Sequence, residues 1–101
     1  MLTSKQRAFL RGQAQHIDTI FQVGKQGVGE ESIGAVKDAL EVREIVKCRI
    51  LDTCPYSAKQ TAELFAEQIG CDCVQVIGSK FVLFMQKKKN SKFDLKNLTT
   101  I

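Results

Sequence analysis

The sequence has few residues of the kinds that stack on bases, bind metals or cross membranes. Its 101 residues include six phenylalanines, one tyrosine and one histidine. Most of the phenylalanines fall on predicted core positions, so exposed platforms for stacking single-stranded bases are few. No apolar run approaches the roughly 20 residues of a membrane-spanning helix, and residues 1–7 lack the apolar stretch of a secretory signal. We therefore expect a soluble, cytoplasmic protein with no membrane partner.

The four cysteines do not have the spacing of a structural zinc site. Such sites usually pair cysteines that are two to four residues apart, whereas Cys71-x-Cys73 is too tight and Cys48-x₅-Cys54 is too loose. His16 lies far from both pairs in the sequence. We therefore predict no metal, no disulfide and no cofactor, and we expect the cysteines to be small apolar residues of the core.

Length and patterning predict one α/β domain over residues 1–86, followed by a basic, mobile tail at 87–101. Apolar periodicity, caps and turn residues predict the order α-β-α-β-α-β-β. The predicted helices cover about 4–15, 30–43 and 58–69, and the predicted strands cover about 19–23, 45–51, 71–77 and 81–85. Two right-handed crossovers imply parallel neighbouring strands, and the closing hairpin makes the four-stranded sheet mixed.

Two strand patterns indicate which faces of the sheet are covered. Apolar residues at 46, 48 and 50 alternate with Lys47 and Arg49, so one face of this strand is predicted to be apolar and the other basic. Residues 81–85 are all apolar. We therefore expect this last strand to lie inside the sheet.

The turn Gly24-Lys25-Gln26-Gly27 joins a predicted strand to a predicted helix. Glycine tolerates positive φ and has no Cβ to keep a ligand away, and consecutive N–H groups in such a turn can form an anion site. A GxxG turn clamps backbone nucleotides in one RNA-binding module. Because Glu30 and Glu31 already compensate the positive end of the helix dipole, we expect any phosphate to bind at the turn amides and Lys25. The same four residues also suit a simple link, and alone they leave both interpretations open.

The charge of the chain is unevenly distributed. Residues 1–29 carry a net charge of +3 and residues 80–101 carry +5, whereas residues 30–46 carry −3. Clustered basic residues are typical of proteins that bind polyanions, although a solvated lysine-rich tail accounts for part of the +5. Arg7 and Arg11 lie one helical turn apart and could straddle a phosphate. An ordinary solvated helix face explains this pair equally well.

Four blocks of sequence follow one another in a characteristic order and spacing. They are Leu2-Thr3-x-Lys5-Gln6-Arg7-x-Phe9-Leu10-Arg11-Gly12, Gln22-Val23-Gly24-Lys25-Gln26-Gly27, Val46-Lys47-Cys48-Arg49-Ile50-Leu51 and Val74-Gln75-Val76-Ile77-Gly78-Ser79-Lys80. Together they resemble the small bacterial YhbY proteins, whose domain is also called the chloroplast RNA splicing and ribosome maturation (CRM) domain. The likeness spans about residues 2–86. It departs at Asp18-Thr19, where relatives commonly have Lys-Pro, and at Gly29, where a threonine often caps the helix.

The resemblance implies a four-stranded mixed sheet with three helices, similar to the C-terminal domain of bacterial initiation factor three. It also implies RNA binding without catalysis and association with precursors of the large ribosomal subunit. We therefore predict a monomeric, non-enzymatic protein whose partner is structured RNA, with ribosomal proteins or assembly factors as further partners. The predicted RNA-binding residues are Lys5, Arg7, Arg11, Gly24, Lys25, Gln26, Gly27, Lys47, Arg49 and Lys80.

Two other classes of function compete with RNA binding. A thiol enzyme would need an activated cysteine near a base, and Cys54 beside Pro55 is the only loop candidate. No carboxylate pair accompanies it, so catalysis is not expected. A protein-interaction module, or a translation-associated factor that contacts the ribosome mainly through proteins, would use the acidic face of the helix at 30–43 to dock a basic partner.

Overall fold

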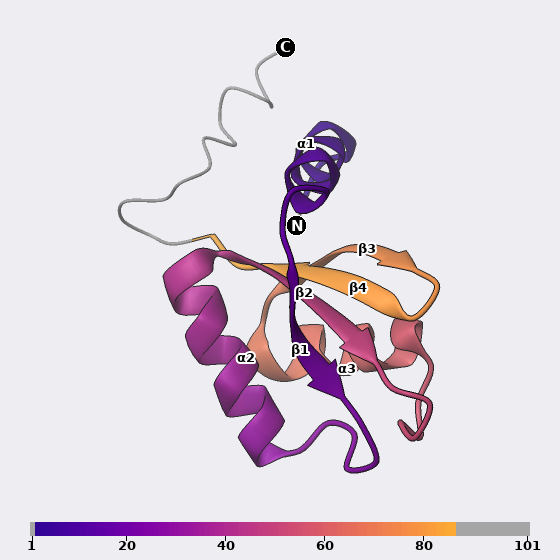
Figure 1. The fold of residues 1–101 in the computed structure, drawn as a ribbon. Helices are drawn as coiled ribbons and strands as arrows, with labels where there is room; N and C mark the ends of the chain where they lie inside the picture. The colour runs from indigo at the N-terminus through magenta and orange to yellow at the C-terminus, as the bar shows by residue number, and fades with distance from the viewer. Residues whose placement is uncertain (1, 87–101) are drawn as a thin grey trace.

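Helices and strands alternate along the chain until a final β-hairpin closes the sheet (Figure 1). The computed structural model describes residues 2–86. Its elements are α1 (Ser4–Ala14), β1 (Thr19–Val23), α2 (Glu30–Arg43), β2 (Ile45–Ile50), α3 (Ala58–Ile69), β3 (Asp72–Ile77) and β4 (Lys80–Phe84). The predicted α/β order is confirmed, with small shifts at element ends. The tail predicted at 87–101 lies outside the described residues.

The four strands form one mixed sheet in the order β1-β2-β4-β3. β1 and β2 are parallel, as predicted for the first crossover, and β4 pairs antiparallel with both β2 and β3. The second crossover does not give neighbouring strands, so that part of the prediction is wrong. β4 returns from the hairpin and inserts between β2 and β3, because it alone has apolar residues for both faces.

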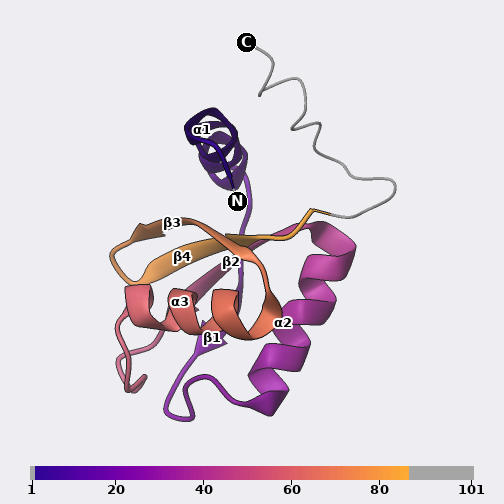
Figure 2. The same ribbon diagram turned by 180° about the vertical axis from the view of Figure 1, so that it is seen from behind.

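Helices cover the two faces of the sheet unequally. α2 and α3 lie together on one face, and α1 lies on the other (Figures 1 and 2). On the two-helix face, Phe65 of α3 stacks on Phe81 of β4 with ring centroids 6.1 Å apart. On the α1 face, Leu10 packs with Val82 and Phe84. β4 is therefore buried on both sides, as predicted, whereas α1 covers only part of its face.

Local capping explains where the helices begin and end. The Thr3 hydroxyl accepts from the N–H of Gln6 at the start of α1, and the Ser57 hydroxyl accepts from the N–H of Gln60 at the start of α3. Gly70 ends α3 in the left-handed conformation, with φ +83°. α2 ends instead at Glu44, a buried residue with φ +67° that no sequence signal indicates. Within residues 2–86, no helix has the length and apolarity needed to cross a membrane.

Candidate nucleic-acid interface

The GxxG turn forms a closed β-turn at the end of β1. The Gly27 N–H donates to the Gly24 carbonyl at 2.9 Å, which leaves Lys25 and Gln26 exposed at the tip. No partner within residues 2–86 accepts from the N–H groups of Lys25 and Gln26. Two of the turn amides are therefore available to an anion, and that of Gly27 is already used.

Of the two glycines of the turn, Gly27 is constrained by packing as well as by conformation. Gly27 is buried with φ +62°, and a Cβ there would lie 3.2 Å from the ring of Tyr56. A Cβ on Gly24 would lie 3.4 Å from the side chains of Leu51 and Thr53. The turn thus packs on the loop after β2. Its two central residues, Lys25 and Gln26, are exposed, whereas Gly27 is buried.

The surface beside the turn is concave but contains acidic residues. A hollow of about 700 Å³ lies between the end of β1, the turn and the first turn of α2. Glu30 and Glu31 line it, so their charge opposes a phosphate on the axis of α2. Gly29 caps this helix without a side chain, and the Ser32 hydroxyl accepts its N–H at 2.9 Å. The first turn of α2 is therefore less favourable to an anion than the tip of the GxxG turn, where Lys25 lies.

A row of polar residues crosses the sheet on the side that α1 covers only in part. Register pairs Gln22 of β1 with Arg49 of β2, Arg49 with Lys80 of β4, and Lys80 with Ile77 of β3. Lys47 lies two residues before Arg49 on the same face, and its Nζ donates to the Ala14 carbonyl at the end of α1, at 3.3 Å. The basic face predicted for β2 thus lies on the α1 side of the sheet. We call the part of this side around Arg49 and Lys80, which α1 leaves uncovered, the open half of the sheet.

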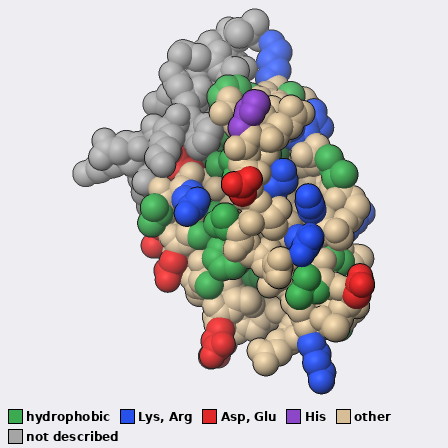
Figure 3. Space-filling model, viewed as in Figure 1, with side chains coloured by type: hydrophobic (Ala, Val, Ile, Leu, Met, Phe, Trp, Pro, Cys, Tyr) green, Lys and Arg blue, Asp and Glu red, His purple; other side chains and the backbone are tan. Residues whose placement is uncertain are grey.

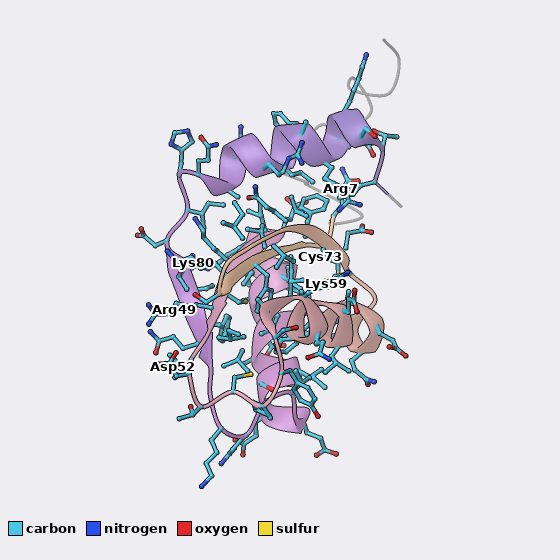
Figure 4. The ribbon with its side chains drawn as sticks, turned by 90° about the vertical axis from the view of Figure 1, so that its right-hand side faces the viewer. Arg7, Arg49, Asp52, Lys59, Cys73 and Lys80 are labelled. Carbon is cyan, nitrogen blue, oxygen red and sulfur yellow. The ribbon has the colours of Figure 1, made fainter. Side chains whose placement is uncertain are left out.

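Arg49 of β2 and Lys80 of β4 place like charges directly opposite each other. Like charges directly opposite each other on neighbouring strands destabilise a sheet. Within residues 2–86 neither side chain forms an ion pair, even though Asp52 lies on the same side (Figure 4). Arg49 Nε is buried and has no hydrogen-bond partner in the described part of the chain. The fold therefore holds two cations side by side without a compensating acid.

Lysine and arginine side chains gather over β2 and β4 on the face seen in Figure 3, between α1 and the end of the molecule that carries the GxxG turn. Figure 1 shows that α1 and this turn lie at opposite ends, so they do not form one contiguous patch. The residues on the sheet lie between them. The predicted RNA-binding residues consequently form three groups, and Figure 4 shows Arg7 on the opposite side of the molecule from Arg49 and Lys80.

The basic residues of α1 differ in how they are held. Arg7 is half-buried, and its Nη1 donates to the Cys73 carbonyl, which ties α1 to β3. Arg11 and Lys5 are exposed. Because Arg7 already supports the packing of α1, its presence is explained without a ligand. Its exposed neighbour Arg11 is better placed for a phosphate.

The cysteines lie in or beside the core. Cys48 is fully buried, and burial raises the pKa of its thiol to about 12. Burial also raises the pKa of Cys71 to about 11 and raises that of Cys73. Thiols of this kind stay protonated at neutral pH and are poor nucleophiles. Among residues 2–86, no group of three or more His, Cys, Asp or Glu side chains is placed to hold a metal ion.

Comparison with known proteins identifies the family of this chain. The profile of the CRS1/YhbY (CRM) domain matches residues 2–85. The chain belongs to the CRS1/YhbY family. This confirms the resemblance seen in the sequence and the prediction that the protein is not an enzyme.

Individual CRM-domain relatives cover nearly the whole chain. The "Probable RNA-binding protein YqeI" of Bacillus subtilis is 40% identical over 95 residues, which cover 94% of this chain and 99% of that protein. The "Probable RNA-binding protein MJ0652" of Methanocaldococcus jannaschii is 30% identical over 94 residues, which cover 91% of this chain and 69% of that protein. The solution structure of the hypothetical protein SAV1595 from Staphylococcus aureus superposes on this one with a TM-score of 0.75. The two sequences are 39% identical, and the match covers 93% of this chain and 98% of that one.

Proposed function

We propose that this CRM-domain protein binds structured RNA of the large ribosomal subunit precursor and acts there without catalysis, as a monomer. The observation that carries the proposal is the Arg49–Lys80 pair, because like charges lie opposite each other there and no acid within residues 2–86 pairs with them. Two relatives that match most of this chain carry the name "Probable RNA-binding protein". A phosphodiester backbone would neutralise both cations at once.

The three basic groups suggest how a duplex could lie on the protein. The GxxG turn, the strands that carry the sheet cations and helix α1 follow one another from one end of the domain to the other (Figure 1). Contacts that are spaced in this way recognise the positions of phosphates, and thus the shape of an RNA helix, more than its sequence. We therefore expect a modest sequence preference and a strong preference for structured RNA.

Salt dependence tests the electrostatic part of the proposal. With about four to six phosphates contacted, the affinity for one structured RNA should fall steeply as salt rises. Titrating a labelled ribosomal RNA hairpin at several salt concentrations measures the slope of log affinity against log salt. A slope near zero would exclude binding through the basic surface.

Crosslinking in cells, followed by sequencing of the attached RNA, tests the choice of partner. Fragments of the large-subunit precursor should be enriched, and a flat profile across cellular RNA would contradict the assembly role. The competing interaction module would dock a basic protein on the acidic α2 instead. Complexes that survive nuclease treatment and depend on α2 would favour that function.

A further inference from the structure

A second, smaller hollow lies where α1 stops covering the sheet. It has a volume of about 230 Å³ and lies between the end of α1 and strands β2, β4 and β3. Its lining includes Gln15, Lys47, Gln75, Ile77, Lys80 and Val82, together with Ala14 and Phe81. Register explains the set, because Lys47 pairs with Val82, Val82 with Gln75, and Lys80 with Ile77. The hollow is therefore built by three paired strands together with the end of α1.

The chemistry of this hollow is mixed. Val82 is a buried apolar residue, and Ile77 is an isoleucine that leaves 62% of its surface exposed. Two primary amides, Gln15 and Gln75, lie on the same rim as the two lysines. A free phosphate would use the lysines alone and would have no need of the amides or of the exposed isoleucine. A nucleotide would use the lysines, the amides and the isoleucine together. Its phosphate would contact the lysines, its planar base would pack on the isoleucine, and a Gln amide can form paired hydrogen bonds with a base edge.

The size of the hollow sets a limit on its occupant. It is several times the roughly 30 Å³ that one water molecule occupies in the liquid. It is smaller than the roughly 300–1,000 Å³ clefts that enclose drug-sized ligands. One nucleobase fits between these limits, and a stacked pair of bases does not.

We propose that this hollow holds a single unpaired nucleotide extruded from the bound RNA. Its base packs on Ile77 and Val82 beside the amide of Gln75, and its phosphate lies toward Lys80 and Arg49, which Figure 4 shows on one side of the molecule. The inference rests on the proposed RNA binding and adds a preference for helices that carry a bulged nucleotide. Such a base is already unstacked, so extruding it costs little.

Three RNA hairpins of identical stem sequence test the proposal. One carries a single bulged adenosine, one carries an abasic ribose at the same place, and one is fully paired. The bulged adenosine should bind about tenfold more tightly than the other two, which is the discrimination expected of one base contact. Equal affinity for the adenosine and abasic bulges would overturn the nucleotide site, because the backbone is the same in both.

Two alanine variants on β3 locate the effect. Ile77→Ala should reduce the preference for the adenosine bulge about fivefold, the loss expected for removing buried methylene contacts. Val76→Ala makes a comparable truncation on the same strand, at a side chain that is 37% exposed on the opposite face, and should leave the preference unchanged. Melting temperatures of both variants check that the fold is kept. An unchanged preference in Ile77→Ala would also overturn the proposal.

The same measurements separate failure of this inference from failure of RNA binding itself. If all three hairpins bind equally and with a steep salt dependence, the protein binds RNA but the hollow takes no base. If none of the hairpins binds at low salt, RNA binding through this surface is wrong, and the nucleotide site falls with it.

Discussion

The GxxG turn and the basic residues of the sheet give similar signals in the sequence. Each places lysine or arginine in a short recognisable pattern, which is a glycine-framed turn in one case and an alternating strand in the other. They differ in what the fold needs from them. Gly27 is buried against Tyr56 and has φ +62°, so the turn would need glycine even without a ligand. Arg49 and Lys80 lie opposite each other with no acidic partner in the described part of the chain, an arrangement that the fold alone does not need. A residue whose placement costs stability is better evidence of binding than one whose placement the fold explains.

Gly27→Asp tests the turn most severely. We expect a loss of about 2 to 3 kcal/mol in the free energy of unfolding, because the left-handed backbone is strained and the new side chain meets Tyr56. RNA binding should nearly disappear, since a carboxylate then lies at the anion site. Thermal melting and RNA affinity in one buffer measure both effects.

Gly70→Asp is the matched control for this variant. Gly70 has φ +83°, and a Cβ there meets nothing within 4 Å, so it shares the backbone strain without the clash. The Gly70→Asp variant should therefore be less destabilised than Gly27→Asp and should bind RNA as tightly as the unmodified protein. Equal melting temperatures would mean that packing on Tyr56 is unimportant. Normal RNA binding by Gly27→Asp would show that the turn is only a link.

The double variant Arg49→Ala, Lys80→Ala tests the sheet. Binding should weaken by about 2 kcal/mol, because two charge-assisted contacts are lost. Stability should stay the same or rise by a few tenths of a kcal/mol, about the size of a relieved cross-strand repulsion. Lys37→Ala with Lys59→Ala removes the same net charge from exposed positions on α2 and α3. If both double variants bind alike, overall charge matters and the sheet row does not.

Lys25→Ala sharpens the comparison at the tip of the turn. One phosphate contact is removed while the turn and its packing remain. We expect affinity to fall by about 1 kcal/mol and the salt slope to decrease by roughly one unit. The melting temperature should not change, because Lys25 is exposed. An unchanged slope would mean that the turn contacts no phosphate, and the sheet and α1 would then account for all electrostatic binding.

Arg7→Ala and Arg11→Ala separate a structural role from an RNA-binding role among the basic residues of α1. Arg7 donates to the Cys73 carbonyl, so its loss should cost about 1 kcal/mol of stability. Arg11→Ala should leave the melting temperature unchanged and weaken RNA binding by a smaller amount. Chemical denaturation and RNA titration distinguish the two. If Arg7→Ala is as stable as Arg11→Ala, the link between α1 and β3 contributes nothing measurable.

Much of the fold could be predicted because its signals are local. Thr3 with Gln6, Ser57 with Gln60, and Gly70 mark helix ends through contacts that span only a few residues. Alternation around Lys47 and Arg49 separates the two faces of β2. Glu44 shows the limit of such signals, because its positive φ is held by burial and by the hydrogen bond from Met85 to its carbonyl. Nothing in the neighbouring sequence indicates either.

The sequence by itself determined the elements, the apolar and basic faces of β2, and the family. Only the tertiary structure decided that β4 separates β2 from β3, that Gly27 packs on Tyr56 and that Arg7 bonds the Cys73 carbonyl. It also decided that Arg49 lies opposite Lys80. Each of these depends on the register of strands or loops far apart in the chain. Periodicity and capping act over one or two turns, whereas strand order and register are set by the burial of both sheet faces together.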